Sequence, residues 1–504
     1  MTTISTNPDG PRDVYAPARK TAVLLVLALA LSHPLAASAQ DAQIAKLQQD
    51  LPVLMEQSHV AGLQVAVLRD GKTAWLGHYG FADKEAKTPV DDQTIFNIAS
   101  LSKTVFAYTA LRLVDEGALD LDEPITHYLK PEHRFGTDPR LDLITARFVL
   151  SHRTGFANWP PDGEKPKIFF TPGTRFSYSG EGMVVLATAI EDKVGKPINQ
   201  IVSEQTFVPL GMTESSYIAA PALKQHFSRG YDYWGSSVPL FQSATANPAA
   251  SLSTTAHDYA LFLEAILDGR GLTPVTLRVM ETPQVAVDPS CTNCLEHDPV
   301  RPSTDLFWGL GWGIEKSASG TYLWHWGDNG VYKAYVVVDV TRRSAVALFA
   351  NDIAGLSIAK AVVTDALGGD HPSFAWLHYD TYDSPSMLFT HEIYAHGPDI
   401  AFRNFSAALA GGAVSENTLN DIGYQFLREK KYPDAITIFR RNVELHPRSA
   451  NTYDSLAEAY MDAGEHDLAV TNYKKSLELN PANGNAKAML AKLASRTPLA
   501  PARS

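Results

Sequence analysis

The sequence predicts an α+β domain, an antiparallel sheet flanked by helices, followed by an all-α domain. A hairpin pattern opens the globular part of the chain, helical segments fill its middle, and strand-like segments with a last helix close it near residue 370. Beyond that point, residues of the same kind recur every 34 positions. A chain of 504 residues is long enough for two or three such domains.

The elements of the first domain follow in order. Two β-rich runs within 62–80 flank Asp70-Gly71, a dipeptide typical of a tight hairpin turn. We expect an amphipathic helix from Ser100 to near Gly117, then a loop-rich stretch over about 120–250 that contains a helix at 181–194. Another helix is expected at 256–268, strands within 306–315, 321–327, 331–340 and 344–352, and a last helix near 355–367.

The N-terminus has the pattern of a secretory signal. Residues 21–31 form an apolar run after Arg19 and Lys20, and Ala37-Ser38-Ala39 follows it as a small-residue cleavage site. An apolar run of that length is too short to span a bilayer. We therefore predict a signal peptide at 1–39, a periplasmic or secreted protein, and no stable membrane span after cleavage. A net charge of −12 without a basic block argues against nucleic acid as a partner.

Cys291 and Cys294 are the two cysteines of the chain. In an exported protein, this spacing favours a local disulfide. A metal site is the alternative, with His297 as a third ligand, but no fourth ligand stands out nearby. We expect no metal and no cofactor.

The C-terminal quarter repeats with the 34-residue tetratricopeptide period. The matching pairs are Ile422 and Leu456, Gly423 and Ala457, Phe426 and Tyr460, Ala435 and Ala469, Phe439 and Tyr473, Pro447 and Pro481. Weaker matches one period earlier predict a degenerate first repeat at about 383–413. The expected organisation is the α+β domain at 40–370, a linker at 371–382, repeats at 383–495 and a tail at 496–504. The alternative is a plain helical bundle.

Such repeats form a concave groove for a protein or peptide partner. They could equally pack against the first domain and shape its cleft.

Two Ser-x-x-Lys tetrapeptides stand in the chain, Ser100 to Lys103 and Ser357 to Lys360. Residues three apart share one helix face, so the lysine can reach the serine oxygen. A desolvated lysine can take the proton of a serine hydroxyl and so make a nucleophile. Context favours Ser100, because Tyr178 and then His325 and Gly327 follow it in suitable settings, whereas Ser357 comes after the last strand.

The order Ser-x-x-Lys, Tyr-x-x and His-x-Gly, with the phrases HRTGF and FTPGTRFSYS between them, resembles the serine β-lactamase-related family. That family includes class C β-lactamases, penicillin-binding D,D-peptidases, D-aminopeptidases and esterases. The resemblance runs from about 45 to 370 and implies a β-lactamase/transpeptidase-like fold.

The resemblance also implies roles. Ser100 would be the acylated nucleophile and Lys103 would help to deprotonate it. Tyr178 would pass a proton to the leaving group and later activate water, and His325 would add hydrogen bonding. The backbone N–H groups of Ser100 and Asp328 would form the oxyanion hole.

Two departures from the class C pattern bear on the substrate. Gly180 stands where the asparagine of Tyr-x-Asn would hold a substrate amide, and His325 stands where Lys-Thr-Gly has its lysine. Both weaken the case for efficient β-lactam hydrolysis and leave esters, amides and D-amino-acid peptides open.

The expected function is an exported serine hydrolase that works through an acyl-enzyme on an ester, amide, D-amino-acid peptide or β-lactam bond. The alternative is a catalytically weak scaffold whose repeats bind a protein or peptide, and Gly180 favours it. Each residue has a structural alternative as well: Ser100 a helix cap, Tyr178 a packed aromatic, His325 an ordinary strand histidine. His391 and His396 are five residues apart on a predicted helix, which splays them too far for a zinc site.

Overall fold

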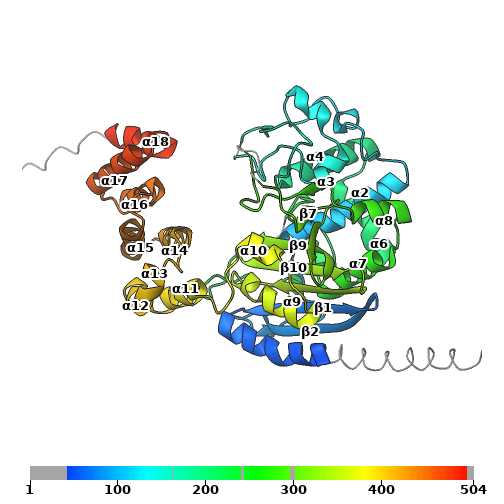
Figure 1. The fold of residues 1–504 in the computed structure, drawn as a ribbon, viewed down its shortest axis with the longest axis horizontal. Coiled ribbons are helices and arrows are strands. Elements are labelled where there is room, and N and C mark those ends of the chain that lie inside the picture. The colour runs from blue at the N-terminus through cyan, green and yellow to red at the C-terminus, as the bar shows by residue number, and fades with distance from the viewer. Residues whose placement is uncertain (1–41, 162, 240–242, 296–300, 496–504) are drawn as a thin grey trace, which may run out of the picture.

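A computed structural model describes residues 42–161, 163–239, 243–295 and 301–495 of the chain. The predicted signal peptide and the C-terminal tail lie outside the described residues. Figure 1 shows a larger unit that holds the sheet and a smaller, all-helical unit beside it. Among the helices described, none is both long and apolar enough to cross a membrane.

The larger unit is built on one nine-stranded antiparallel sheet, as predicted. Its order is β3 (Thr88–Pro89), β2 (Lys72–Asp83), β1 (Gly62–Arg69), β11 (Ser344–Ala350), β10 (Tyr332–Asp339), β9 (Gly320–Asn329), β8 (Gly313–Ser317), β7 (Leu306–Trp308) and β6 (Val285–Ala286). The Asp70-Gly71 hairpin is confirmed, with Arg69 opposite Lys72 and positive φ angles of 52° and 78° at the two turn residues.

Helices cover both faces of this sheet. On one face, α9 (Ala359–Leu367) and a helix over residues 42–58 pack against Leu63, Val65 and Val67. On the other face, α2 (Ser102–Asp115) and α7 (Ala256–Asp268) pack against Ala66 and Leu68. The alternation of β1 side chains between two cores explains why this strand is buried along its whole length.

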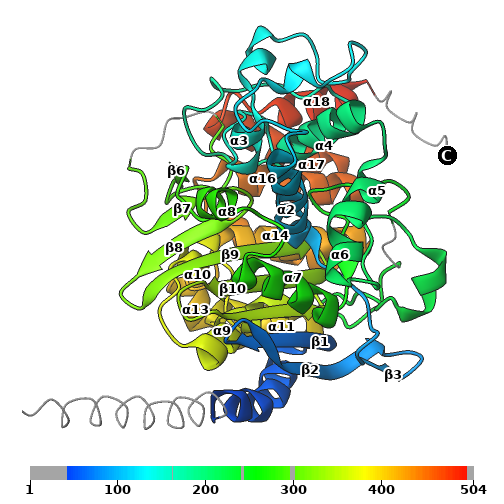
Figure 2. The ribbon, with the colours of Figure 1, turned by 90° about the vertical axis from the view of Figure 1, so that its right-hand side faces the viewer.

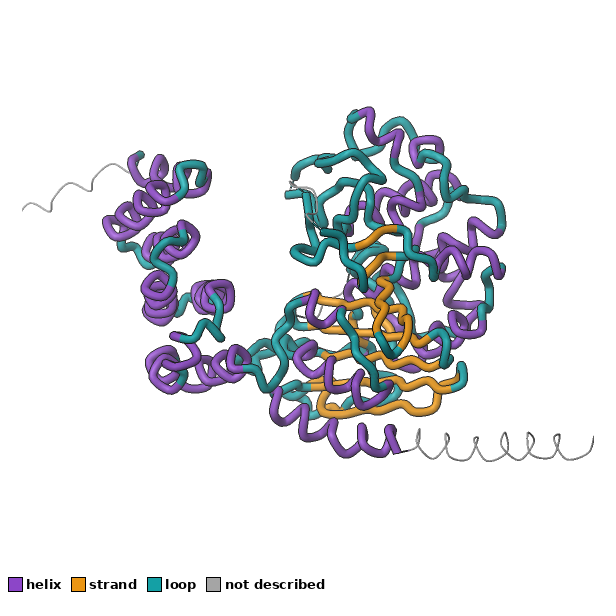
Figure 3. The backbone as a smooth tube through the Cα atoms, viewed as in Figure 1, coloured by secondary structure: helices purple, strands orange, loops and turns teal. Residues whose placement is uncertain are grey.

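The remaining helices and loops gather above the sheet, as Figure 3 shows. They include α3 (Ala146–Leu150) and α4 (Gly180–Val194). The other helices of this unit are α5 (Ile198–Val202), α6 (Val208–Leu210) and α8 (Pro274–Met280), and short 3-10 helices lie at Ala99–Leu101, Ile125–His127, Pro139–Leu143, Pro221–His226 and Gly355–Ile358, the last of them leading into α9. A two-stranded sheet, β4 (Phe96–Asn97) with β5 (Ser253–Thr254), stands at the entrance to α2. The predicted helices at 100–117, 181–194, 256–268 and 355–367 are thus present, the first and last of them opening with a 3-10 turn.

The segment expected as a linker, 371–382, is packed on the larger unit. It contains α10 (Ser373–Leu377), whose Trp376 is 5% exposed and donates its indole N–H to the Asp288 carbonyl at 2.7 Å. Ser373 shares a hydrogen bond of 2.8 Å with the Tyr335 hydroxyl. Burial of this indole holds the segment in place on the larger unit, whereas a flexible linker would not be held.

The smaller unit is entirely helical. Its elements are α11 (Pro385–His396), α12 (Pro398–Asn404), α13 (Ser406–Ala410), α14 (Glu416–Arg428), α15 (Tyr432–Leu445), α16 (Ala450–Asp462), α17 (His466–Leu479) and α18 (Gly484–Ala494). The α16–α17 pair begins 34 residues after the α14–α15 pair at both helices. Gly423 permits α14 to pack closely on α15, because a Cβ at this position would lie 2.6 Å from the Phe439 ring. Figure 2 shows these helices behind the larger unit.

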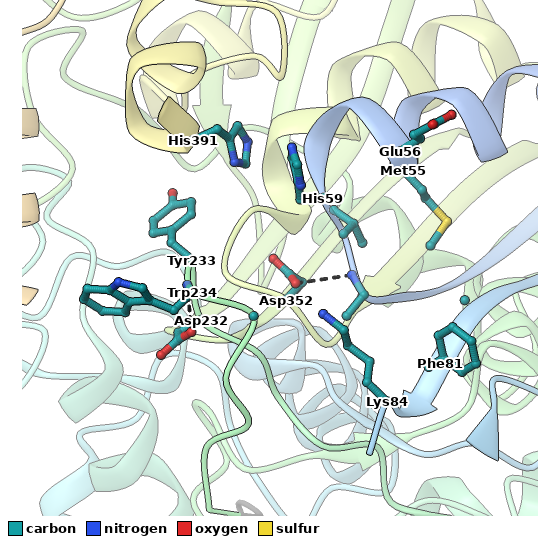
Figure 4. A pocket seen from close by; sticks show the side chains of 14 residues that line it. Met55, Glu56, His59, Phe81, Lys84, Asp232, Tyr233, Trp234, Asp352 and His391 are labelled. Atoms are coloured by element: carbon teal, nitrogen blue, oxygen red, sulfur yellow. Dashed lines mark hydrogen bonds between the residues drawn. The ribbon is translucent and has the colours of Figure 1, made fainter. Parts of the chain in front are cut away.

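The two units contact each other through aromatic side chains. Tyr233 and Trp234, from a loop of the larger unit, pack against Tyr394 with ring centroids 5.1 and 4.5 Å apart. A cavity of about 470 Å³ lies at this junction, and Figure 4 shows His59 and His391 on one side of it and Lys84 on another. None of the residues predicted to be catalytic lines this cavity.

Candidate active site

Ser100 and Lys103 lie where the 3-10 helix Ala99–Leu101 leads into α2. The Lys103 ammonium group, Nζ, is 2.9 Å from Ser100 Oγ and 2.7 Å from the Ala249 carbonyl oxygen. Lys103 is fully buried, and this desolvation holds its pKa well below the usual value for lysine. Burial thus disfavours the ammonium form, and a lysine that gives up its proton more readily can accept the proton of a neighbouring serine hydroxyl.

The backbone before Ser100 is held in a rare conformation. Ala99 has a φ of 47°, in the left-handed region that costs a non-glycine residue about 1–3 kcal/mol. Asn97 supports it, because its side-chain oxygen accepts the Ala99 N–H at 3.1 Å and the Asn329 amide at 2.7 Å. The serine is therefore fixed by the end of β9 as well as by its own helix. No motif in the sequence marks Asn97 or Asn329, and neither was predicted as a site residue.

Tyr178 lies over the lysine. Lys103 Nζ is 4.8 Å from the centroid of the Tyr178 ring, and the tyrosine hydroxyl is buried without a hydrogen-bond partner among the described residues. Burial raises the pKa of this hydroxyl above the usual value for tyrosine, and the nearby Ser100 hydroxyl offsets this only in part. Ser179 next to it caps α4 by accepting the Gly182 N–H at 3.0 Å, which explains why the tyrosine stands immediately before that helix.

Two buried histidines flank Tyr178. His325, on β9, has its ring centroid 6.2 Å away, and His152 lies closer at 4.3 Å. Burial, together with the charge of Lys103, lowers the pKa of His325 to about 3, so this imidazole is neutral. Burial likewise lowers the pKa of His152, whose Nδ1 accepts the Ser179 N–H at 3.1 Å. His152 belongs to the HRTGF phrase, which was the signal that could have found it.

The end of β9 forms one wall of the site. The β8–β9 ladder stops at the Gly313–Trp324 pair, so residues 325–329 have no strand partner on that side among the described strands. Gly327 is required where β9 passes the nucleophile, because a Cβ there would lie 2.4 Å from the Ile98 carbonyl oxygen. Asp328 follows, with its carboxylate 2.5 Å from Lys333 Nζ.

The sequence model of the Beta-lactamase family matches residues 47–360. The chain belongs to this family. A "Beta-lactamase" from Pseudomonas fluorescens is 29% identical over 227 residues, covering 42% of this chain and 61% of that protein. "Esterase EstB" from Burkholderia gladioli is 27% identical over 207 residues, covering 35% of this chain and 52% of that protein. The chain thus spans about three fifths or less of these two relatives.

Solved structures agree on the fold. The octameric penicillin-binding protein homologue from Pyrococcus abyssi superposes with a TM-score of 0.55 and 22% identity, over 69% of this chain and 80% of that one. Beta-lactamase-family relatives are serine hydrolases. The three residues whose order along the chain predicted this membership lie together in the fold: Ser100, Tyr178 and His325.

This beta-lactamase-family chain fills the space beside Tyr178 differently from the Tyr-x-Asn pattern. The indole of Trp159 lies over Gly180, where a Cβ would be 2.5 Å from the ring. Asn158 holds the segment there by accepting the Gly180 N–H at 2.8 Å. Trp159 remains 43% exposed and therefore presents an aromatic surface beside the site. The sequence analysis missed Trp159, since only the fold brings it against α4.

The other candidate residues are not part of this cluster, although the cysteine loop contacts it. Cys291 and Cys294 form a disulfide in a loop whose Thr292 carbonyl accepts the Tyr178 N–H at 2.8 Å, while His297 lies outside the described residues. Ser357 is 4% exposed and lies before α9, with Lys360 exposed to solvent.

Proposed function

We propose that this protein is an exported serine hydrolase that forms an acyl-enzyme on Ser100. The contact of 2.9 Å between Ser100 Oγ and the buried Lys103 Nζ carries the proposal, because burial lowers the pKa of this lysine and so favours the neutral form that can take a proton. The lowered pKa of Lys103 is caused by its desolvation.

In the reaction, Lys103 accepts the Ser100 proton while Oγ attacks the carbonyl carbon of the substrate. The negative oxygen that forms is stabilised by the backbone N–H groups of Ser100 and Asp328. Tyr178 donates a proton to the leaving group as its bond to carbon breaks, and the tyrosine is re-protonated from Lys103. In the second half, a water molecule gives its proton to the same pair and attacks the carbonyl carbon of the acyl-enzyme. The bond between that carbon and Oγ breaks, the pair returns the proton to Oγ, and the acid and Ser100 are released.

The surroundings favour uncharged esters and amides as substrates. His325 is neutral, so it offers no cation to a substrate carboxylate, and Trp159 covers the position of the amide-binding side chain of the Tyr-x-Asn pattern. Similarity to the esterase from Burkholderia gladioli supports the same class. We therefore propose ester or amide hydrolysis, including D-amino-acid amides, with β-lactams as poor substrates.

The test is covalent labelling of the full chain with a fluorophosphonate, combined with assays on p-nitrophenyl acetate, a D-alanyl amide and nitrocefin. We expect one label, on Ser100 by peptide mapping, and ester turnover that Ser100→Ala abolishes. A folded wild-type protein that is neither labelled nor active on any of the three substrates would contradict the proposal.

The helical unit supports a second candidate function. We infer that α14–α18 are tetratricopeptide repeats that bind a protein or peptide, because successive helix pairs begin 34 residues apart. If the protein is mainly such a scaffold, Ser100→Ala will retain its partner and wild type will show no hydrolysis above background.

Export is tested separately. The N-terminal sequence of the mature protein should begin near residue 40, and a start at residue 1 would contradict export.

A further inference from the structure

Tyr379 reaches the catalytic unit from outside the part of the chain that the family model matches, which ends at residue 360. It follows α10, where His378 adopts a left-handed φ of 56° and ends the helix. The Tyr379 hydroxyl donates a hydrogen bond to Asp328 Oδ2 at 2.7 Å. Tyr379 as a whole is 37% exposed, but desolvation of its hydroxyl, and then the charge of Asp328, raise the pKa of that hydroxyl, so it stays protonated and remains a donor.

The Asp328 carboxylate is held on both oxygens. Its other oxygen, Oδ1, receives Lys333 Nζ at 2.5 Å and the Gly330 N–H at 3.0 Å. These two donors belong to the β9–β10 hairpin itself, because Lys333 lies directly opposite Asp328 in the ladder. Tyr379 ties the end of that hairpin to the segment after α10. Lys333 also lies over the Tyr379 ring, with Nζ 5.9 Å from its centroid.

Asp328 is the residue whose backbone N–H the proposed mechanism assigns to the oxyanion hole. Donors stabilise a transition state only when they are fixed in the right place before the reaction, and small misplacements are costly. The free edge of residues 325–329 lacks the ladder that would otherwise fix it on the β8 side.

We propose that Tyr379 is a positioning residue of the active site, which holds the end of β9 so that the Asp328 N–H points at the developing oxyanion. This inference rests on the proposed function. Tyr379 also lines a cavity of about 570 Å³ between the larger unit and α14, shared with Asp421 and Gln425 of that helix. The segment that joins the two units is therefore part of the catalytic unit, and a fragment ending at residue 370 would lack this contact.

The test compares Tyr379→Phe with Tyr382→Phe in the full chain. Tyr382 lies in the same segment, and its backbone N–H donates to the Ser357 carbonyl at 3.1 Å rather than reaching Asp328. We expect Tyr379→Phe to lower kcat for p-nitrophenyl acetate about 10-fold, with KM within about twofold and Tm nearly unchanged, because the ring stays in place. Tyr382→Phe should retain the wild-type kcat.

A double-mutant cycle with Asp328→Asn separates positioning from packing. If Tyr379 acts through Asp328, adding Tyr379→Phe to Asp328→Asn lowers kcat by less than about twofold further. A Tyr379→Phe variant with wild-type kcat overturns the inference. So does a double variant whose loss of kcat equals the product of the losses in the two single variants. A labelled, active wild type with either of those results overturns this inference alone. An unlabelled, inactive and folded wild type overturns the proposed function with it.

Discussion

The two Ser-x-x-Lys segments of this chain have the same spacing and opposite environments. At Ser100, the lysine three residues later is fully buried and lies 2.9 Å from the serine oxygen. At Ser357, the serine is the buried member, its hydroxyl has no hydrogen-bond partner among the described residues, and Lys360 is exposed. The pattern that permits a nucleophile is thus present twice, and the burial that would activate it is present once.

The difference teaches that desolvation of the base matters more than the spacing. An exposed lysine keeps its charge near neutral pH and cannot accept a proton from a serine. Lys103 loses that hydration because α2 begins beneath Tyr178 and beside the 247–252 loop, which supplies the Ala249 carbonyl. Lys360 stands on the solvent side of α9 and has no such cover.

The largest expected effect comes from removing the two lysines in turn. Lys103→Met should lower kcat/KM for p-nitrophenyl acetate by about 10³-fold, because it removes the proton acceptor while keeping the apolar stem. Lys360→Met should change the same quantity less than about twofold. Comparable losses in both variants, with both proteins folded by circular dichroism, would show that the comparison misidentifies the catalytic copy.

The next effect concerns one tyrosine in contact with each of the two segments. Tyr178→Phe should lower kcat by about 10²-fold, because proton transfer to the leaving group loses its donor. Tyr382→Phe, beside Ser357, should leave kcat unchanged. Stopped-flow measurement of the p-nitrophenol burst would show whether acylation is the slowed step; wild-type kcat in Tyr178→Phe would exclude the role proposed for this tyrosine.

The pH dependence of stability tests the buried surroundings of the first copy. The folded-state pKa of His325, about 3, lies below its unfolded value of about 6.5. Between these values the unfolded chain binds the proton and the folded chain does not, so this histidine's contribution makes the free energy of unfolding fall as pH falls through that window. When the pH falls from 6.5 to 4.5, we expect the free energy of unfolding of His325→Asn to decrease by about 2 kcal/mol less than that of wild type, as measured by urea titration.

The wild-type profile, measured under the same conditions, is the reference for this variant. Parallel profiles for wild type and His325→Asn would mean that this imidazole titrates normally. The buried Asp352 acts in the opposite direction, because burial raises its pKa to about 7 and its contribution falls as pH rises toward that value. Only the difference between variants, therefore, isolates the histidine.

The smallest effect is on stability at the second copy. Ser357→Ala should raise the free energy of unfolding by up to about 1 kcal/mol, because it removes a buried hydroxyl without a partner. Ser100→Ala should leave stability within about 0.5 kcal/mol while abolishing turnover. Urea unfolding of both variants measures this, and a clear loss of stability in Ser357→Ala would mean that its hydroxyl is bonded after all.

The sequence by itself determined several elements and the order of the candidate catalytic residues. Local signals suffice for the Asp70-Gly71 hairpin, because turn geometry depends on two residues, and for the helix that follows Ser179, because its cap is local. The order of Ser100, Tyr178 and His325 also indicated the family that the comparison then showed.

Only the tertiary structure decided which groups meet. Burial of Lys103, the indole of Trp159 over Gly180, and the Tyr379 hydroxyl on Asp328 join segments that are tens of residues apart or more. No periodicity or spacing encodes such contacts, because they depend on how helices and strands pack rather than on neighbours along the chain. For the same reason, the segment expected as a linker is packed on the larger unit, where Trp376 is buried.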